Sequence, residues 1–171
     1  MALPGCKMMV FVEPPTAFIK IAGRAAAEGA RDFQQLVRRL HSEGIPRFCL
    51  DLTACLLMDS TFSGVLAGLV NEFGPGPDNN CKRFTVVGAN ARVLDLLDNL
   101  GVLPLTNSLA QDVISDAKSN GTEIVIGQHS RTELATCCLE AHQMLMTLKP
   151  ENTAKFRSVT EVLEQQLSAT A

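Results

Sequence analysis

The sequence predicts one α/β domain, in which a mixed sheet of about five strands packs against short helices, followed by a C-terminal helical hairpin. Two patterns indicate this class. Between residues 17 and 119, segments with strand-like periodicity alternate with segments of helical period, whereas beyond residue 127 the pattern is helical. The chain has 171 residues, 46% of them hydrophobic and 19% charged, which suffices for a buried core. We therefore predict a domain over residues 1–127 and a hairpin extension over residues 128–171.

The first two strands are predicted at residues 8–13 and 17–22, on either side of Pro14 and Pro15. Residues 17–22 alternate between two faces, with Ile19 and Ile21 on one face and Lys20 on the other. A proline cannot donate to a strand ladder, so the Pro-Pro step marks a turn. The shortness of this turn favours antiparallel pairing of the two strands.

Helices and strands then alternate along the chain. The predicted elements are a helix over 28–42, a strand over 47–52, a helix over 60–73, a strand over 84–87, a helix over 90–100, a short strand over 102–105 and a helix over 108–119. The helix over 60–73 must end where it does, because residues 74–77 contain two glycines and two prolines. The apolar run at 84–87 is typical of a strand covered on both faces, which indicates parallel pairing in this part of the sheet.

The C-terminal part begins with residues 123–127, which fit either an edge strand or a linker. Ser130 and Glu133 then have the spacing of a capping box at a helix start. Apolar residues follow at helical spacing, and Pro150 restarts a second helix. Two interpretations of this hairpin stay open: it packs on its own domain or on itself, or it docks a partner or makes a homodimer.

Composition excludes several classes of function. The net charge is −3 and the isoelectric point about 5.6, which is not the basic balance of a nucleic-acid-binding domain. No apolar run reaches the length of a membrane span, and the first residues lack the features of a signal peptide, so we expect a cytoplasmic protein without membrane insertion. The six cysteines form no CxxC pair and the three histidines are scattered, so we expect neither a metal nor a cofactor.

The segment most suggestive of function is Asp59, Ser60 and Thr61, directly before a predicted helix. Such residues cap helices, because their side chains accept hydrogen bonds from the free N–H groups of the first turn. A helix N-terminus also accommodates a phosphate, through its dipole and the same N–H groups. The small residues that follow predict an open, flat surface for a partner; they are Ser63, Gly64, Ala67 and Gly68.

Several stretches of the chain resemble the STAS family, the anti-sigma-factor antagonist domains that also form the cytosolic part of sulfate transporters. The matching stretches are Phe48 to Leu52, Met58 to Thr61, Gly64 to Ala67, Phe84 to Ala89, Val93 to Leu97 and Leu100 to Val102. The likeness extends over residues 8–119 and implies a STAS-like sandwich. Where the family commonly has glycine after the second hydroxyl residue, this chain has Phe62.

The resemblance implies a signalling domain that regulates transcription through protein binding. Ser60 would be the phospho-acceptor, with Thr61 as the alternative acceptor and Asp59 as the supporting carboxylate. The partners would be a serine/threonine kinase of the anti-sigma type and its cognate phosphatase. The interaction surface would comprise Asp59, Phe62, Ser63, Gly64 and Ala67 around Ser60.

Other functions remain as alternatives. A STAS-like domain can instead be a non-phosphorylated accessory subunit of a transporter complex, of the lipid-trafficking ABC type, with the hairpin as a docking element. Binding of a nucleotide or small ligand has no dedicated loop in this sequence. Catalysis is not expected, because the chain has no GxSxG elbow, no phosphate-binding glycine-rich loop and no Cys–His pair with sequence support.

Overall fold

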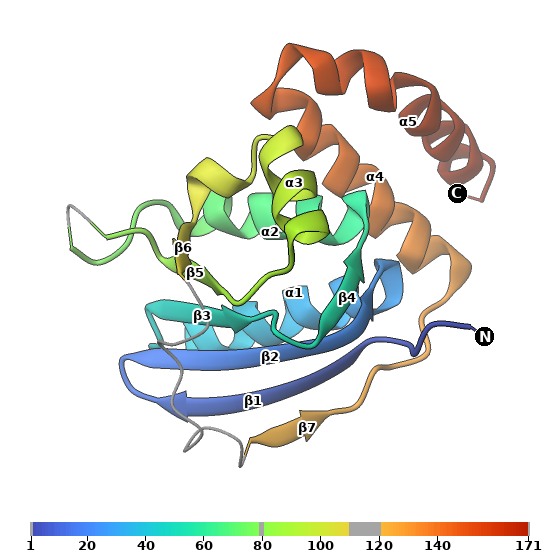
Figure 1. Ribbon diagram of the computed structural model, residues 1–171. Helices are drawn as coiled ribbons and strands as arrows, with labels where there is room; N and C mark the ends of the chain where they lie inside the picture. The colour runs from blue at the N-terminus through green and yellow to red at the C-terminus, as the bar shows by residue number, and fades with distance from the viewer. Residues whose placement is uncertain (1, 79–80, 110–120, 171) are drawn as a thin grey trace.

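A computed structural model describes residues 2–78, 81–109 and 121–170 of the chain. These residues form a mixed, seven-stranded sheet with helices packed on it (Figure 1). The elements are β1 (Lys7–Glu13), β2 (Thr16–Ala25), α1 (Ala27–Ser42), β3 (Arg47–Asp51), β4 (Cys55–Met58), α2 (Ser60–Phe73), β5 (Phe84–Val87), α3 (Ala91–Asn99), the 3-10 helix η1 (Leu103–Leu105), β6 (Asn107–Leu109), β7 (Thr122–Ile124), α4 (Arg131–Leu148) and α5 (Pro150–Thr170). The predicted α/β class with a mixed sheet is confirmed.

The strand order is β6-β5-β3-β2-β1-β7, and β4 pairs with the far end of β2. β1 is antiparallel to both β2 and β7, as the Pro-Pro turn predicts for the first pair, and the remaining pairs are parallel. Residues of β2 alternate between a buried and an exposed face, as predicted: Ile19 and Ile21 are fully buried, whereas Lys20 is exposed. A strand that is buried on one face specifies its register, because a slip of one residue would turn Ile19 and Ile21 toward solvent.

Three sequence predictions differ from the structure. Residues 103–105 form η1 instead of a strand; Leu105 donates to Val102 and Thr106 to Leu103 within this turn, and Pro104 has no N–H for a ladder. The helix expected over 108–119 is wrong at its start, which belongs to β6, and the rest lies outside the described residues. The sequence does not predict β4. Of the two alternatives for residues 123–127, the edge strand is the one found, as β7 over Thr122–Ile124. The sheet therefore has seven strands instead of about five.

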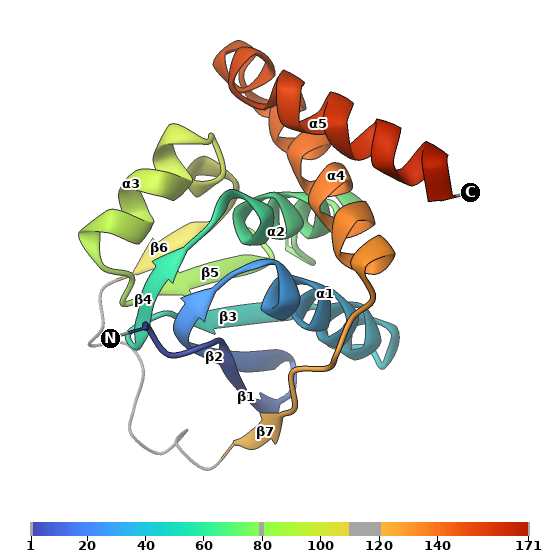
Figure 2. The same cartoon turned by 90° about the vertical axis from the view of Figure 1, so that its right-hand side faces the viewer.

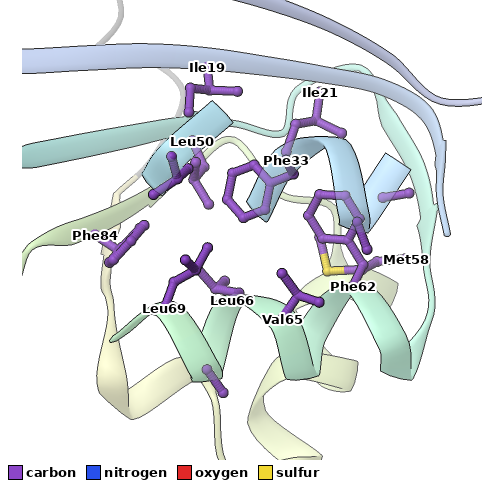
Figure 3. Packing of buried hydrophobic residues seen from close by; sticks show 14 of the residues in the cluster. Ile19, Ile21, Phe33, Leu50, Met58, Phe62, Val65, Leu66, Leu69 and Phe84 are labelled. Atoms are coloured by element: carbon purple, nitrogen blue, oxygen red, sulfur yellow. The ribbon is translucent and has the colours of Figure 1, made fainter. Parts of the chain in front are cut away.

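The core lies between one face of the sheet and the two helices α1 and α2 (Figure 3). Ile19, Ile21 and Leu50 project from the strands toward Phe33 of α1 and Phe62 of α2. The rings of Phe33 and Phe62 stack with their centroids 5.0 Å apart. Burial of such large apolar side chains is the main stabilising contribution to a domain of this size.

The C-terminal hairpin lies on the outer side of these helices. α4 runs across α2 and α1, and α5 packs along α4 at the periphery (Figures 1 and 2). The hydrophobic cluster is continuous across the predicted boundary at residue 127, since Cys137, Ala141, Leu145 and Phe156 belong to it. Among the described helices, none combines the length and the hydropathy needed to cross a membrane.

Two polar anchors hold the hairpin. At its start, the partly buried carboxylate of Asp32 lies 2.7 Å from Nε2 of His129 and accepts a hydrogen bond from the Gly127 N–H. The predicted capping box of Ser130 and Glu133 is confirmed. At the turn between α4 and α5, the buried Asn152 amide donates to the carbonyls of Leu100 (2.9 Å) and Leu145 (2.7 Å).

Candidate functional site

The candidate site is the start of α2, where the chain leaves β4. Asp59 has extended backbone, and its carboxylate accepts a hydrogen bond of 2.8 Å from the Phe62 N–H. The Asp59 N–H donates in turn to the Ala25 carbonyl at 3.0 Å, which joins this turn to the end of β2. Asp59 is therefore the N-cap residue and Ser60 the first residue of α2. Burial raises the pKa of the Asp59 carboxyl, partly offset by its bond from Phe62.

The hydroxyl of Ser60 is half-buried and bound to a residue of the hairpin. Its Oγ lies 2.8 Å from Nε2 of His142, which comes from α4. The Nδ1 of the same ring lies 3.4 Å from the sulfur of Cys138, one turn earlier on α4. The imidazole also stacks on the ring of Phe156 in α5, with centroids 4.7 Å apart. His142 thus links the start of α2 to both helices of the hairpin.

The neighbouring hydroxyl, that of Thr61, is buried. Only 4% of Thr61 is exposed, and its Oγ1 donates to the sulfur of Cys138 at 3.4 Å. The two acceptors that the resemblance implies therefore differ in access, because Ser60 keeps part of its surface and Thr61 almost none. Both hydroxyls have their hydrogen-bonding partner on α4.

The small residues of α2 do not form an open surface, so this prediction is wrong for Ser63, Gly64 and Ala67. All three are buried. A Cβ added at Gly64 would lie 2.7 Å from the carbonyl carbon of Ala141 and 2.8 Å from its Cβ, closer than side chains pack. At Gly64, α4 therefore approaches α2 too closely for a Cβ, while Gly68, one turn on, is half-buried and has room for one. We call Ser60, Thr61 and Gly64 the covered face of α2.

Phe62 was assigned to the interaction surface, but its side chain lies in the core. It is fully buried and faces Phe33 beneath the sheet (Figure 3). The reason is the periodicity of the helix: Phe62, Val65, Leu66 and Leu69 share the side of α2 that faces the sheet, and Ser60 and Gly64 share another.

His142 and Cys138 were not identified from the sequence. One signal was present, because a spacing of four residues places both on the same side of a helix. A second signal lies in α2 itself, where the first twelve residues, 60–71, include no charged side chain. A helix without a charged face is generally covered all round, which predicts a second layer over α2.

The pKa of His142 gives a testable pH dependence. Burial lowers the pKa of its imidazole, so the folded chain holds this proton less tightly than the unfolded chain, whose histidines titrate near 6.5. Stability from neutral His142 is therefore present above pH 6.5 and lost as the pH falls through 6.5 toward the lower, folded pKa. We expect the urea midpoint to fall between pH 7.5 and pH 5.5, and to fall less in His142→Gln.

The change of the urea midpoint with pH is compared between the wild-type chain and His142→Gln. The difference isolates His142, because Asp59 and the other carboxyls are common to both chains. Equal slopes in the wild-type chain and in His142→Gln would contradict the prediction. The Cys138 thiol and the Ser60 hydroxyl are the polar groups bonded to the ring, and both are kept in this variant.

No metal centre is formed by the described residues: nowhere among them do three or more His, Cys, Asp or Glu side chains gather in a way that could hold an ion. The covered face offers two alcohol groups at the N-terminus of α2, and α4 places the imidazole of His142 and the thiol of Cys138 against them.

Comparison with solved structures identifies the fold. The fold is similar to that of the anti-sigma factor antagonist SpoIIAA in its unphosphorylated form, with a TM-score of 0.51 and 13% sequence identity. The match covers 61% of this chain and 90% of SpoIIAA. No family model matches the sequence, and no curated protein matches it either. The structure therefore has a STAS-like fold, as the resemblance implies, and about two fifths of the chain lies outside the shared part.

Proposed function

We propose that this chain is a non-catalytic protein-interaction domain that binds a regulatory protein through the start of α2 and is switched by a phosphate on Ser60. The observation that supports this most is the position of the Ser60 hydroxyl, at the first residue of a capped helix in a fold shared with an anti-sigma factor antagonist. The partners we propose are a serine/threonine kinase of the anti-sigma type and a phosphatase that restores the hydroxyl.

The start of α2 suits this chemistry. In the transfer, Ser60 Oγ bonds to the γ-phosphorus of ATP, the bond between that phosphorus and the leaving ADP breaks, and the hydroxyl proton passes to a base of the kinase. The phosphate adds a charge of about −1.5 to −2 beside the positive end of the helix dipole. Asp59 lies next to it and is already engaged with the Phe62 N–H, so the modified site would carry strong, localised negative charge. Such a change alters protein binding without requiring a new fold.

The contact between Ser60 and His142 does not by itself make a hydrolase. An activated serine needs a base that a third group orients, usually a carboxylate on the other ring nitrogen. Here Nδ1 of His142 meets the thiol of Cys138, and the serine lies under α4. We therefore assign these groups to binding.

The experiment uses the purified full-length chain. It is incubated with ATP and an extract of its source cells, and phosphorylated residues are mapped by mass spectrometry. In parallel, wild-type chain, Ser60→Ala and Ser60→Asp are used as baits for the kinase. We expect phosphate on Ser60, a serine kinase bound to wild type and to Ser60→Ala, and loss of that kinase from Ser60→Asp. Ser168→Asp, on the exposed side of α5, is the matched control and is expected to bind as wild type does.

Two results would contradict the proposal. One is the absence of phosphate from both Ser60 and Thr61 together with identical binding by all baits. The other is recovery of ABC transporter subunits irrespective of the residue at position 60, which would favour the accessory-subunit alternative.

A further inference from the structure

We infer that α4 is an autoinhibitory element: it occupies the covered face of α2 in the closed chain, and it must leave before Ser60 is modified or a partner docks. This inference rests on the proposed function, since it names the regulation of the same site. It starts from the contacts that α4 makes, which coincide with the residues to which the switch is assigned.

The contacts lie within little more than one turn on each helix. Ser60 meets His142, Thr61 meets Cys138, and Gly64 meets Ala141. The first two pairs are polar, and the third is a close backbone approach that only a residue without a Cβ permits on α2. Both candidate phospho-acceptors are therefore bonded to the element that covers them.

A phosphate on Ser60 competes with the closing contact to His142. The 2.8 Å between Ser60 Oγ and His142 Nε2 is a hydrogen-bond distance, so a phosphorus atom with three oxygens cannot lie between these two atoms while the bond is kept. The imidazole cannot simply turn aside, since it is buried against Phe156 and Cys138. A phosphate on Ser60 would therefore hold the chain open.

The attachment of α4 shows which contacts an opening must break: those of Gly127 and His129 with Asp32, and the packing of Ala141 and Leu145 in the core cluster. The chain enters it through six residues, 125–130, and its first turn is held to α1 by the ion pair of Arg31 with Glu133 at 3.3 Å. Packing of α4 on α2 is tight at Gly64 and loosens toward Gly68, beside a hollow of about 250 Å³ lined by Gly68, Glu72 and Met144 among others. Opening would leave the sheet, α1 and the inner side of α2 in place.

The first test is native-state hydrogen exchange on the wild-type chain, which needs no variant. We expect amides in the middle of α4 and the first turn of α2 to exchange together, through a partial opening, and faster than amides of β2 and β3. If α4 exchanges only with the sheet, in global unfolding, it is an integral part of the fold and the inference is wrong.

The second test opens the chain without altering α2. In Ala141→Leu, the larger side chain meets Gly64, where there is no room even for a Cβ. Overpacking of this kind should speed exchange in α4 and the start of α2 by a factor on the order of ten to a hundred. Ala154→Leu, at an exposed position of α5, is the matched control and should exchange as wild type does.

The probe for the vacated face is a fluorescent peptide of residues 130–148, which carries the sequence of α4. Under reducing conditions we expect it to bind Ala141→Leu measurably and wild type not at all. Binding to neither, with unchanged exchange in Ala141→Leu, would overturn the inference. If Ala141→Leu fails to fold, His142→Ala takes its place. Hydrogen exchange of the wild-type chain still decides whether α4 opens separately from the sheet. None of these readouts involves a kinase, so a failure of the proposed switch at Ser60 would be seen separately.

Discussion

Replacing Phe62 by alanine is expected to lower the free energy of unfolding by about 3–5 kcal/mol, the usual cost of removing a large buried ring. Its ring is fully buried and stacks on Phe33 between α2 and the sheet. The surrounding residues belong to rigid elements on both sides and cannot close the cavity completely. The chain has neither Trp nor Tyr, so urea unfolding is best followed by far-ultraviolet circular dichroism.

Phe11→Ala is the control for this change, because Phe11 is only half-buried on β1. A smaller loss is expected there, since the removed ring gives up less contact. Equal losses in the two variants would mean that Phe62 is not a core residue. The comparison matters for function, because a residue of an interaction surface should affect binding with little loss of stability, and Phe62 should do the opposite.

Alanine substitution at the two internal glycines of α2 is expected to have opposite effects. Gly68→Ala should stabilise the chain by about 0.5–1 kcal/mol, since it restores helix propensity where a Cβ has room. Gly64→Ala gains the same propensity but forces a Cβ into Ala141. Overpacking typically costs about 1–3 kcal/mol, so a net loss of up to about 2 kcal/mol is expected.

The measurement is the urea midpoint of both variants, again by circular dichroism, with hydrogen exchange of α4 as the second readout. The two substitutions are chemically identical and lie one turn apart in one helix, so propensity cancels in their difference. If both variants gain stability, α4 does not lie on Gly64 as tightly as the structure has it. If Gly64→Ala also speeds exchange in α4, the loss arises at the contact between the helices.

The sequence predicts those elements whose signals are local. The bounds of α2 follow from the cap at Asp59 and from the glycines and prolines at residues 74–77, and both are as predicted. The antiparallel pairing of β1 with β2 follows from one short turn. Two elements give no such local signal. β4 has only four residues without polar–apolar alternation, and η1 is a short apolar stretch that forms a 3-10 turn.

What covers α2 could not be predicted in the same way. Ser60 and His142 are 82 residues apart, and no local pattern specifies that they meet. The small residues of α2 predict close approach of another backbone. That backbone can belong to a partner protein or to a second helix of the same chain, and the pattern of small residues does not tell the two apart. The absence of charged residues over 60–71 favours cover by the chain's own helix, since a helix face exposed to solvent usually carries charged side chains.

The short connection between β7 and α4 has a consequence for affinity. A helix tethered by six residues is present at its own binding face at an effective concentration of the order of millimolar. In the proposed switch a partner competes with this helix, and its apparent dissociation constant rises in inverse proportion to the fraction of open chains. Substitutions in α4 or in residues 125–130 would therefore change how much partner is needed while every residue that the partner touches stays the same. Under the proposed regulation, the hairpin would set the partner concentration needed for a response, and α2 would set which partner binds.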